Sequence, residues 1–222
     1  MMSPLTRTWS TVLFDLDGTL VHSAPVILEG LAHVHESLGL PVPSESDLLD
    51  WIGPPLYDSL RERAMLSDSE ALHARQLYRD YTEGAERHVA LFPGVFGVLE
   101  QLVAAGVPIG LATSKPERTA LGILDSLGIA SLFTVSVGAD EALGRISKAD
   151  VVGEALLRLA AHGVDIEAPV MVGDRGVDVD GAAAHAVPTI LVEWGYGNPS
   201  EAADALAIVA SADQLRSLLL GA

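Results

Sequence analysis

Short apolar segments recur along this chain, and each is followed by a turn and a longer stretch with helical spacing. The segments are rich in Val, Ile and Leu and lie at 11–14, 107–112, 133–137, 169–172 and 188–192, with a weaker one at 207–209. Strands that are apolar on both faces are typical of parallel sheets covered by helices on both sides. The pattern therefore predicts a doubly wound, Rossmann-like α/β fold.

The alternation is interrupted once, between the first and second predicted strands. Residues 15–106 contain no convincing strand, whereas 24–38, 56–65 and 68–88 carry apolar residues at three- and four-residue spacing. A structureless connection of this length is improbable in a compact domain. We therefore expect an α-helical cap domain at 22–90, inserted into a catalytic core that consists of 1–21 and 91–222.

Charge and composition narrow the classes of partner. The chain of 222 residues is 49% hydrophobic, and 13 Lys and Arg against 30 Asp and Glu give a formal net charge of −17. Such a charge repels nucleic acid and anionic membranes. No apolar run could span a bilayer, residues 1–7 are not followed by a signal-peptide core, and cysteine is absent. We expect a cytoplasmic protein, a monomer or homodimer, without nucleic-acid or membrane partners.

Polar residues gather where the predicted strands end, which is the edge at which open parallel sheets bind ligands. Asp15 and Asp17 follow the first strand, Thr113 ends the second, and Asp174 and Asp178 follow the fourth. Four carboxylates on one rim would repel one another unless a cation lay between them. Oxygen donors without Cys or a nearby His favour Mg²⁺, Mn²⁺ or Ca²⁺ over zinc.

Lys148 begins the predicted helix 148–162, where Ser147 and Asp150 form a typical helix start. A lysine there opposes the helix dipole, which a bound anion would explain. Lysine, hydroxyl and carboxylates together predict a phosphoryl-transfer site. One carboxylate would attack phosphorus, and a second would protonate the leaving oxygen and then activate water. A metal and Lys148 would neutralise the phosphoryl oxygens.

These residues fall in four segments that follow one another along the chain. The segments read FDLDGTL at 14–20, LATSKP at 111–116, SKA at 147–149 and VGDRGVD at 172–178. With a cap-sized insertion after the first segment, the chain strongly resembles the haloacid dehalogenase-like hydrolase superfamily. Within it, the chain is similar to the phosphoglycolate-phosphatase-like branch, which has an inserted helical cap.

The resemblance implies roles for the four carboxylates. Asp15 would be the nucleophile and a metal ligand, and Asp17 the general acid/base, with a backbone carbonyl that also reaches the metal. Asp174 would ligate Mg²⁺ directly, and Asp178 directly or through water. The carboxylate at Asp17 favours phosphate chemistry over dehalogenation.

The implied phosphate ligands are Thr113, Ser114 and Lys148. The chain departs from close relatives at His22, where they commonly have Asp, and we interpret it as a linker histidine. Asp180 is interpreted as a solvated carboxylate.

We predict a Mg²⁺-dependent phosphatase for a small phosphomonoester such as 2-phosphoglycolate, a sugar phosphate or a nucleoside monophosphate. One alternative is a phosphosugar mutase of the β-phosphoglucomutase kind, with Arg61 and Arg63 as candidates for the distal phosphate. Another is a phospho-accepting signalling domain, although receiver domains have about half this length. Trp51 and Trp194 are candidates for substrate contacts or for core packing.

Overall fold

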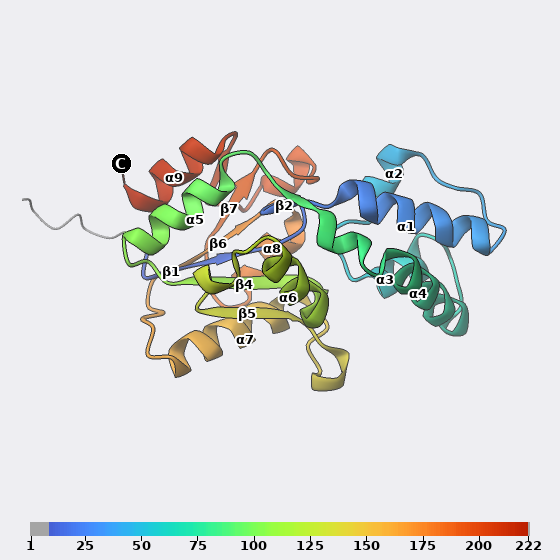
Figure 1. The fold of residues 1–222 in the computed structure, drawn as a ribbon, viewed down its shortest axis with the longest axis horizontal. Coiled ribbons are helices and arrows are strands. Elements are labelled where there is room, and N and C mark those ends of the chain that lie inside the picture. Colours follow the sequence, from blue (N-terminus) through green and yellow to red (C-terminus); the bar gives the residue numbers. More distant parts are fainter. Residues whose placement is uncertain (1–8, 222) are drawn as a thin grey trace, which may run out of the picture.

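The centre of the molecule is a six-stranded parallel sheet in the order β5–β4–β1–β6–β7–β8 (Figure 1). The computed structural model describes residues 9–221, apart from the side chains of residues 86, 87, 199 and 202, so predicted core residues 1–8 lie outside the described part. The sheet confirms the predicted α/β class. Its strands are β1 Thr11–Phe14, β4 Ile109–Pro116, β5 Val135–Ala139, β6 Pro169–Gly173, β7 Thr189–Val192 and β8 Ala207–Val209.

Helices cover both faces of this sheet, as the doubly apolar strands require. Successive side chains of a strand point to opposite faces, and β1 shows the consequence. Val12 and Phe14 pack in the cluster that includes α5, α6 and α9, whereas Leu13 packs against α7 and α8. The helices are α5 Val95–Ala104, α6 Glu117–Ser126, α7 Lys148–Ala161, α8 Gly176–Ala183 and α9 Ala212–Leu220.

Four further helices form a separate layer beside the sheet, on the right of Figure 1, which we call the helical layer. They are α1 Ala24–Ser37, α2 Glu45–Leu49, α3 Leu56–Glu62 and α4 Asp68–Thr82, and they bury their own hydrophobic cluster. A capping box of Ser67 and Glu70 starts α4. The predicted helix 68–88 is shorter than expected because Gly84, with φ 88°, separates α4 from the 3₁₀ turn Ala85–His88.

Two short antiparallel strands, β2 Val21–His22 and β3 Ala90–Leu91, connect the helical layer to the sheet. They were not expected, since a two-residue strand shows no periodicity. The predicted boundaries between core and cap fall inside this ribbon, and the division into two domains stays a prediction. Three more 3₁₀ turns lie at η2 Ala130–Leu132, η3 Glu141–Leu143 and η4 Pro199–Ala202. Among residues 9–221, no helix combines the length and apolarity that a membrane span requires.

Candidate active site

The turn after β1 holds the first two carboxylates in different surroundings. The backbone N–H of Asp15 donates to the carbonyl of Val172 at 2.9 Å, which fixes the turn against β6. The next turn needs glycine, because Gly18 has φ 86° and a Cβ there would lie 2.2 Å from an Asp174 carboxylate oxygen. Asp15 is buried, whereas Asp17 is partly exposed and pairs with Lys115 Nζ at 3.2 Å.

Three buried carboxylates form a cluster at this edge of the sheet. Asp15, Asp174 and Asp178 each offer an oxygen within 4.8 Å of the others. Asp178 Oδ2 accepts hydrogen bonds from the backbone N–H groups of Asp174 at 3.1 Å and Arg175 at 3.0 Å, which holds the loop before α8. The Thr19 hydroxyl donates to Asp174 Oδ1 at 3.3 Å. Lys148 also contacts this cluster, which therefore contains four of the predicted site residues.

Lys148 lies between two of these carboxylates. Its Nζ contacts Asp15 Oδ1 at 2.6 Å and Asp178 Oδ1 at 2.7 Å, and the residue is only 6% exposed. The capping box of Ser147 and Asp150 starts α7 as expected. The position of Lys148 at the start of a helix predicted a bound anion. In this structure the anionic groups beside Lys148 are the carboxylates of Asp15 and Asp178.

Burial and mutual repulsion shift the ionisation of the cluster. Burial raises the pKa of Asp15 to about 6, with the charge of Asp178 adding to this and Lys148 opposing it. Burial also raises the pKa of Asp174, helped by Asp178 and Asp15. Burial disfavours the charged form of Lys148, but Asp15 and Asp178 outweigh it and raise its pKa. Three carboxylates against one ammonium leave an excess of negative charge, and their hard oxygen donors fit Mg²⁺.

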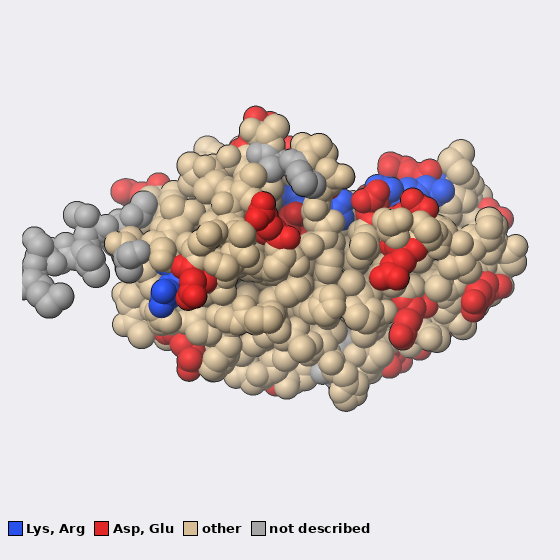
Figure 2. Space-filling view, turned by 90° about the horizontal axis from the view of Figure 1, so that it is seen from above, with Lys and Arg blue, Asp and Glu red and all other residues tan. Residues whose placement is uncertain are grey.

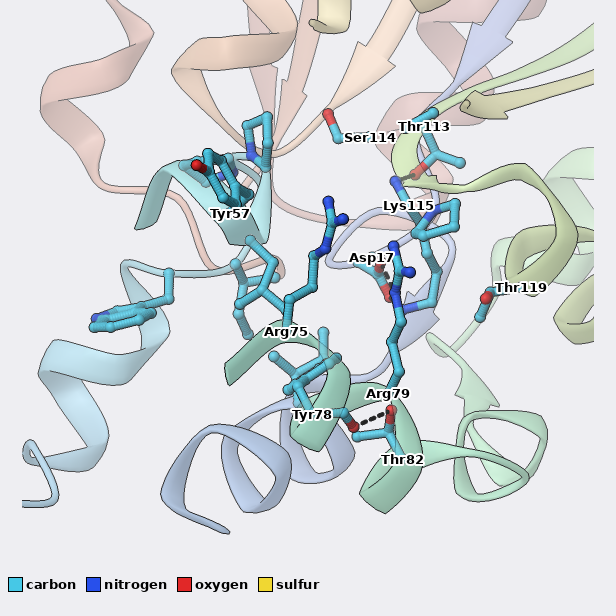
Figure 3. Close-up of a pocket in the computed structure, with 18 of the residues that line it drawn as sticks. Asp17, Tyr57, Arg75, Tyr78, Arg79, Thr82, Thr113, Ser114, Lys115 and Thr119 are labelled. Atoms are coloured by element: carbon cyan, nitrogen blue, oxygen red, sulfur yellow. Dashed lines mark hydrogen bonds and ion pairs between the residues drawn. The ribbon is translucent and has the colours of Figure 1, made fainter. Parts of the chain in front are cut away.

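The predicted phosphate ligands on β4 lie beside Asp17. Thr113 is buried, and its Oγ1 accepts a hydrogen bond from the backbone N–H of Lys115 at 3.2 Å. Figure 3 shows Thr113, Ser114, Lys115 and Asp17 around one cavity, which Asp15 also lines. Lys148 does not line the cavity itself, but it contacts Asp15, which does.

The cavity has a volume of about 910 Å³ and lies between the strand ends and the helical layer. Trp51 lines it and also packs inside the helical layer, with its ring 5.4 Å from that of His35. Trp194 does not line it, and its indole N–H donates to the carbonyl of Thr19 at 3.1 Å. The residues from the helical layer that line the cavity include Trp51, Tyr57, Leu72, Arg75, Tyr78 and Arg79.

Arg61 and Arg63, the candidates for a distal phosphate, do not line the cavity. Arg61 Nε pairs with Asp68 at 2.7 Å, and Arg63 Nη1 lies 4.0 Å from Asp50. Asp180 is exposed, as expected for a solvated carboxylate.

Sequence reasoning missed Arg175, although it lies inside the fourth segment. It is buried, and its Nη1 donates to the carbonyl of Ile52 in the helical layer. Its Nε donates to Glu201 at 3.1 Å, and Gly53 approaches so closely that a Cβ there would lie 2.9 Å from Arg175 Cγ. Arg175 thus connects the loop of the acidic cluster to the helical layer.

Tyr196 makes a second connection that the sequence did not reveal. Its backbone N–H donates to Asp174 Oδ2 at 2.7 Å, and its hydroxyl accepts from the backbone N–H of Ala24 at 2.9 Å. The hydroxyl also lies 3.1 Å from Nδ1 of His22, whose ring is 5.4 Å from that of Phe92. His22 therefore contacts Tyr196 and Phe92 at the entry to the helical layer, and its part as a linker residue stays a prediction.

Comparisons with known proteins agree with this geometry. The family model described as haloacid dehalogenase-like hydrolase matches residues 12–192. Tyrosine-protein kinase PtkA of Mycobacterium tuberculosis is 45% identical over 188 residues, which cover 84% of this chain and 62% of that relative. The chain thus spans less than two thirds of the length of this relative. Phosphoglycolate phosphatase of Escherichia coli is 33% identical over 217 residues, covering 87% of this chain and 84% of that enzyme.

A solved structure shows the same fold. A predicted phosphatase from Clostridium acetobutylicum superposes with a TM-score of 0.89 at 31% identity, covering 96% of this chain and 99% of that one. The family model, the phosphoglycolate phosphatase relatives and this solved structure thus agree with one another in pointing to phosphatases of one fold.

Proposed function

Because the chain belongs to the haloacid dehalogenase-like hydrolase family, we propose that it is a Mg²⁺-dependent phosphatase that uses Asp15 as its nucleophile. The single observation that carries this proposal is the contact of Asp15 with Lys148 within a cluster of buried carboxylates, at the floor of a large cavity. The substrate is a small phosphomonoester, of the size range from 2-phosphoglycolate to a sugar phosphate or nucleoside monophosphate.

The first step forms a bond between a carboxylate oxygen of Asp15 and phosphorus while the bond from phosphorus to the ester oxygen breaks. Asp17 gives its proton to the departing alkoxide oxygen. In the second step Asp17 takes a proton from water, whose oxygen attacks phosphorus. The bond between phosphorus and Asp15 then breaks, and inorganic phosphate leaves.

Asp15, Asp174 and Asp178 would hold the Mg²⁺, with the backbone carbonyl of Asp17 as a further ligand. When bound, the ion supplies positive charge at the phosphoryl oxygens and offsets the excess negative charge of the cluster. The hydroxyls of Thr113 and Ser114 would orient the phosphoryl group, and Lys148 would hold Asp15 and compensate charge. The helical layer, residues 22–90, would act as a cap that selects the leaving group.

The setting that we propose is a cytoplasmic enzyme, a monomer or homodimer, without nucleic-acid or membrane partners. The formal net charge of −17 supports the part of this proposal that concerns nucleic acid and anionic membranes.

The test is hydrolysis of p-nitrophenyl phosphate with Mg²⁺, comparing the wild type with Asp15→Asn. We expect kcat/KM to fall by about a thousandfold or more, because the amide cannot form the phosphoenzyme. Asp180→Asn removes an exposed carboxylate of α8, the helix that also carries Asp178, and should behave like the wild type. Equal turnover by Asp15→Asn would remove Asp15 from the mechanism.

The product separates the remaining readings. Steady release of inorganic phosphate without a sugar bisphosphate rules out the mutase. A phosphoenzyme that forms once and does not turn over would indicate a signalling domain. Transfer of the phosphoryl group to a tyrosine hydroxyl in place of water would indicate the activity in the name of the relative PtkA.

A further inference from the structure

Two arginines of the helical layer reach into the cavity from α4. Arg75 and Arg79 are four residues apart on one helix, so their side chains lie on the same face. In Figure 3 both side chains extend from α4 into the cavity, which Asp17 and Lys115 also line. A chain with only 13 Lys and Arg thus places two of them on the helix that faces the cavity lined by Asp15 and Asp17.

The two arginines differ in their partners. Arg75 pairs with Glu141 of η3, and its guanidinium lies 5.7 Å from the centre of the Tyr57 ring. Within the part of the chain whose side chains are described, no carboxylate lies within 4.0 Å of the Arg79 guanidinium. Even the carboxylates of Asp58, Asp80 and Glu83, which line the same cavity, do not pair with Arg79. The N–H groups of the Arg79 guanidinium are therefore available to donate hydrogen bonds to a ligand in the cavity.

The other arginines of the helical layer with described side chains behave differently. Arg61 and Arg63 each pair with a carboxylate outside the cavity. Figure 2 shows that the few basic side chains on one face of the molecule also lie beside acidic ones. Arg79 is exposed and lines the cavity, so its guanidinium is available to an anionic ligand there.

The size of the cavity indicates a large leaving group. Arg175 donates to Ile52, Tyr196 accepts from Ala24 and Arg75 pairs with Glu141, so three separate contacts hold the helical layer against the rest of the molecule. The volume of about 910 Å³ is therefore that of a docked arrangement, near the upper end of the ~300–1,000 Å³ typical of ligand pockets. A two-carbon leaving group would fill a small part of it. The apolar and aromatic wall includes Ile27, Leu31, Trp51, Leu56, Tyr57 and Leu72.

We propose that the substrate is a phosphate ester with a bulky, partly apolar leaving group that carries a second anionic group, and that Arg79 binds this second anion. The inference rests on the proposed function, since the phosphoryl group is placed at Asp15. A carboxylate and a second phosphate share the required chemistry, and the experiment uses a carboxylate as the probe.

The charge is tested with phenyl phosphate and 4-carboxyphenyl phosphate as paired substrates. We expect Arg79→Gln to lower the ratio of kcat/KM for the carboxylated over the neutral ester by about tenfold, the effect of one charge-assisted hydrogen bond. The intrinsic reactivity of the two esters cancels, because each ratio is compared between proteins. Arg63→Gln removes the same charge from the helical layer away from the cavity and should keep the wild-type ratio.

A variant with the opposite charge at position 79 distinguishes a lost ion pair with the substrate from a structural effect of the substitution. Arg79→Glu should favour 4-(aminomethyl)phenyl phosphate over the carboxylated ester, the opposite of the wild-type preference. Size is tested by inhibition with two carboxylated phosphonates that cannot be hydrolysed. We expect 4-(phosphonomethyl)benzoate to bind more tightly than phosphonoacetate.

The outcomes separate this inference from the proposed function. If the wild type hydrolyses none of the esters, the proposed function fails. If it hydrolyses them but Arg79→Gln keeps the wild-type ratio, Arg79 does not bind the anion and the inference is overturned. Tighter binding of phosphonoacetate would overturn the bulky leaving group while leaving the phosphatase in place.

Discussion

Replacing Lys148 with Met tests the charge balance of the acidic cluster most directly. Lys148 is buried, and its ammonium forms ion pairs with Asp15 at 2.6 Å and with Asp178 at 2.7 Å. Each pair corresponds to about 6 kcal/mol at an effective dielectric constant of 20, before the cost of burying the ammonium is subtracted. Removing one partner of a buried pair costs about 3–5 kcal/mol. We expect Lys148→Met to lower the free energy of unfolding by that amount at pH 8 without metal.

The pH dependence of this loss follows from Asp15. Its pKa is raised to about 6 even with Lys148 opposing the shift, so removing Lys148 raises the pKa further. A carboxyl with a raised pKa in the folded state favours folding while it is protonated, and that contribution disappears as the pH rises through the folded pKa. The variant should therefore lose less stability at pH 5 than at pH 8.

The measurement is urea unfolding of both proteins with a chelator, at pH 5 and pH 8, followed by circular dichroism. Added Mg²⁺ should restore part of the stability at pH 8, since it neutralises the same carboxylates. Arg63→Gln, which removes an exposed ion pair, should cost about 1 kcal/mol or less. A loss below about 1 kcal/mol for Lys148→Met at pH 8, or an equal loss at both pH values, would refute the charge-balance argument.

Two further predictions concern the metal and the loop after β7. Mg²⁺ must displace the proton of Asp15 below pH 6, so its affinity should fall by about tenfold per pH unit there; calorimetric titration at pH 5 and pH 7 would contradict this if the affinities were equal. In Gly195→Ala the new Cβ would lie 2.3 Å from that of Asp174, and we expect weaker Mg²⁺ binding by the same titration. Gly97→Ala, where a Cβ meets no atom within 4 Å, is its control, and equal binding by the two variants would show that the loop yields.

The parallel sheet could be predicted from the sequence because its strands are buried on both faces. Such strands are apolar at nearly every position, as in Thr11–Phe14, where all four residues are buried and only Thr11 is polar. The ribbon of β2 and β3 could not be predicted, since two residues carry no alternation. Nor could α2, which has only five residues. The end of α4 was placed too late because Gly84 interrupts a spacing that otherwise continues.

The acidic cluster was predictable for a related reason. Asp15 and Asp174 directly follow neighbouring parallel strands, and strand order places them side by side. Arg79 and Arg175 act across the boundary between the sheet and the helical layer. How two layers dock depends on three-dimensional packing and leaves no periodic pattern. The four-residue spacing of Arg75 and Arg79 fits a shared face of a helix, but nothing in it indicates that this face meets the cavity.

The charges within the site explain how an acidic chain could bind an anionic ester. Lys115 and Lys148 are the two lysines of the chain, and each contacts a carboxylate of the site, Asp17 in one case and Asp15 in the other. When all three clustered carboxylates are ionised, they and Lys148 leave two negative charges, which one divalent cation would cancel. Asp17 and Lys115 cancel each other. Phosphate binding at Asp15 should therefore require the cation first, whereas the anion subsite at Arg79 should bind a carboxylate without it.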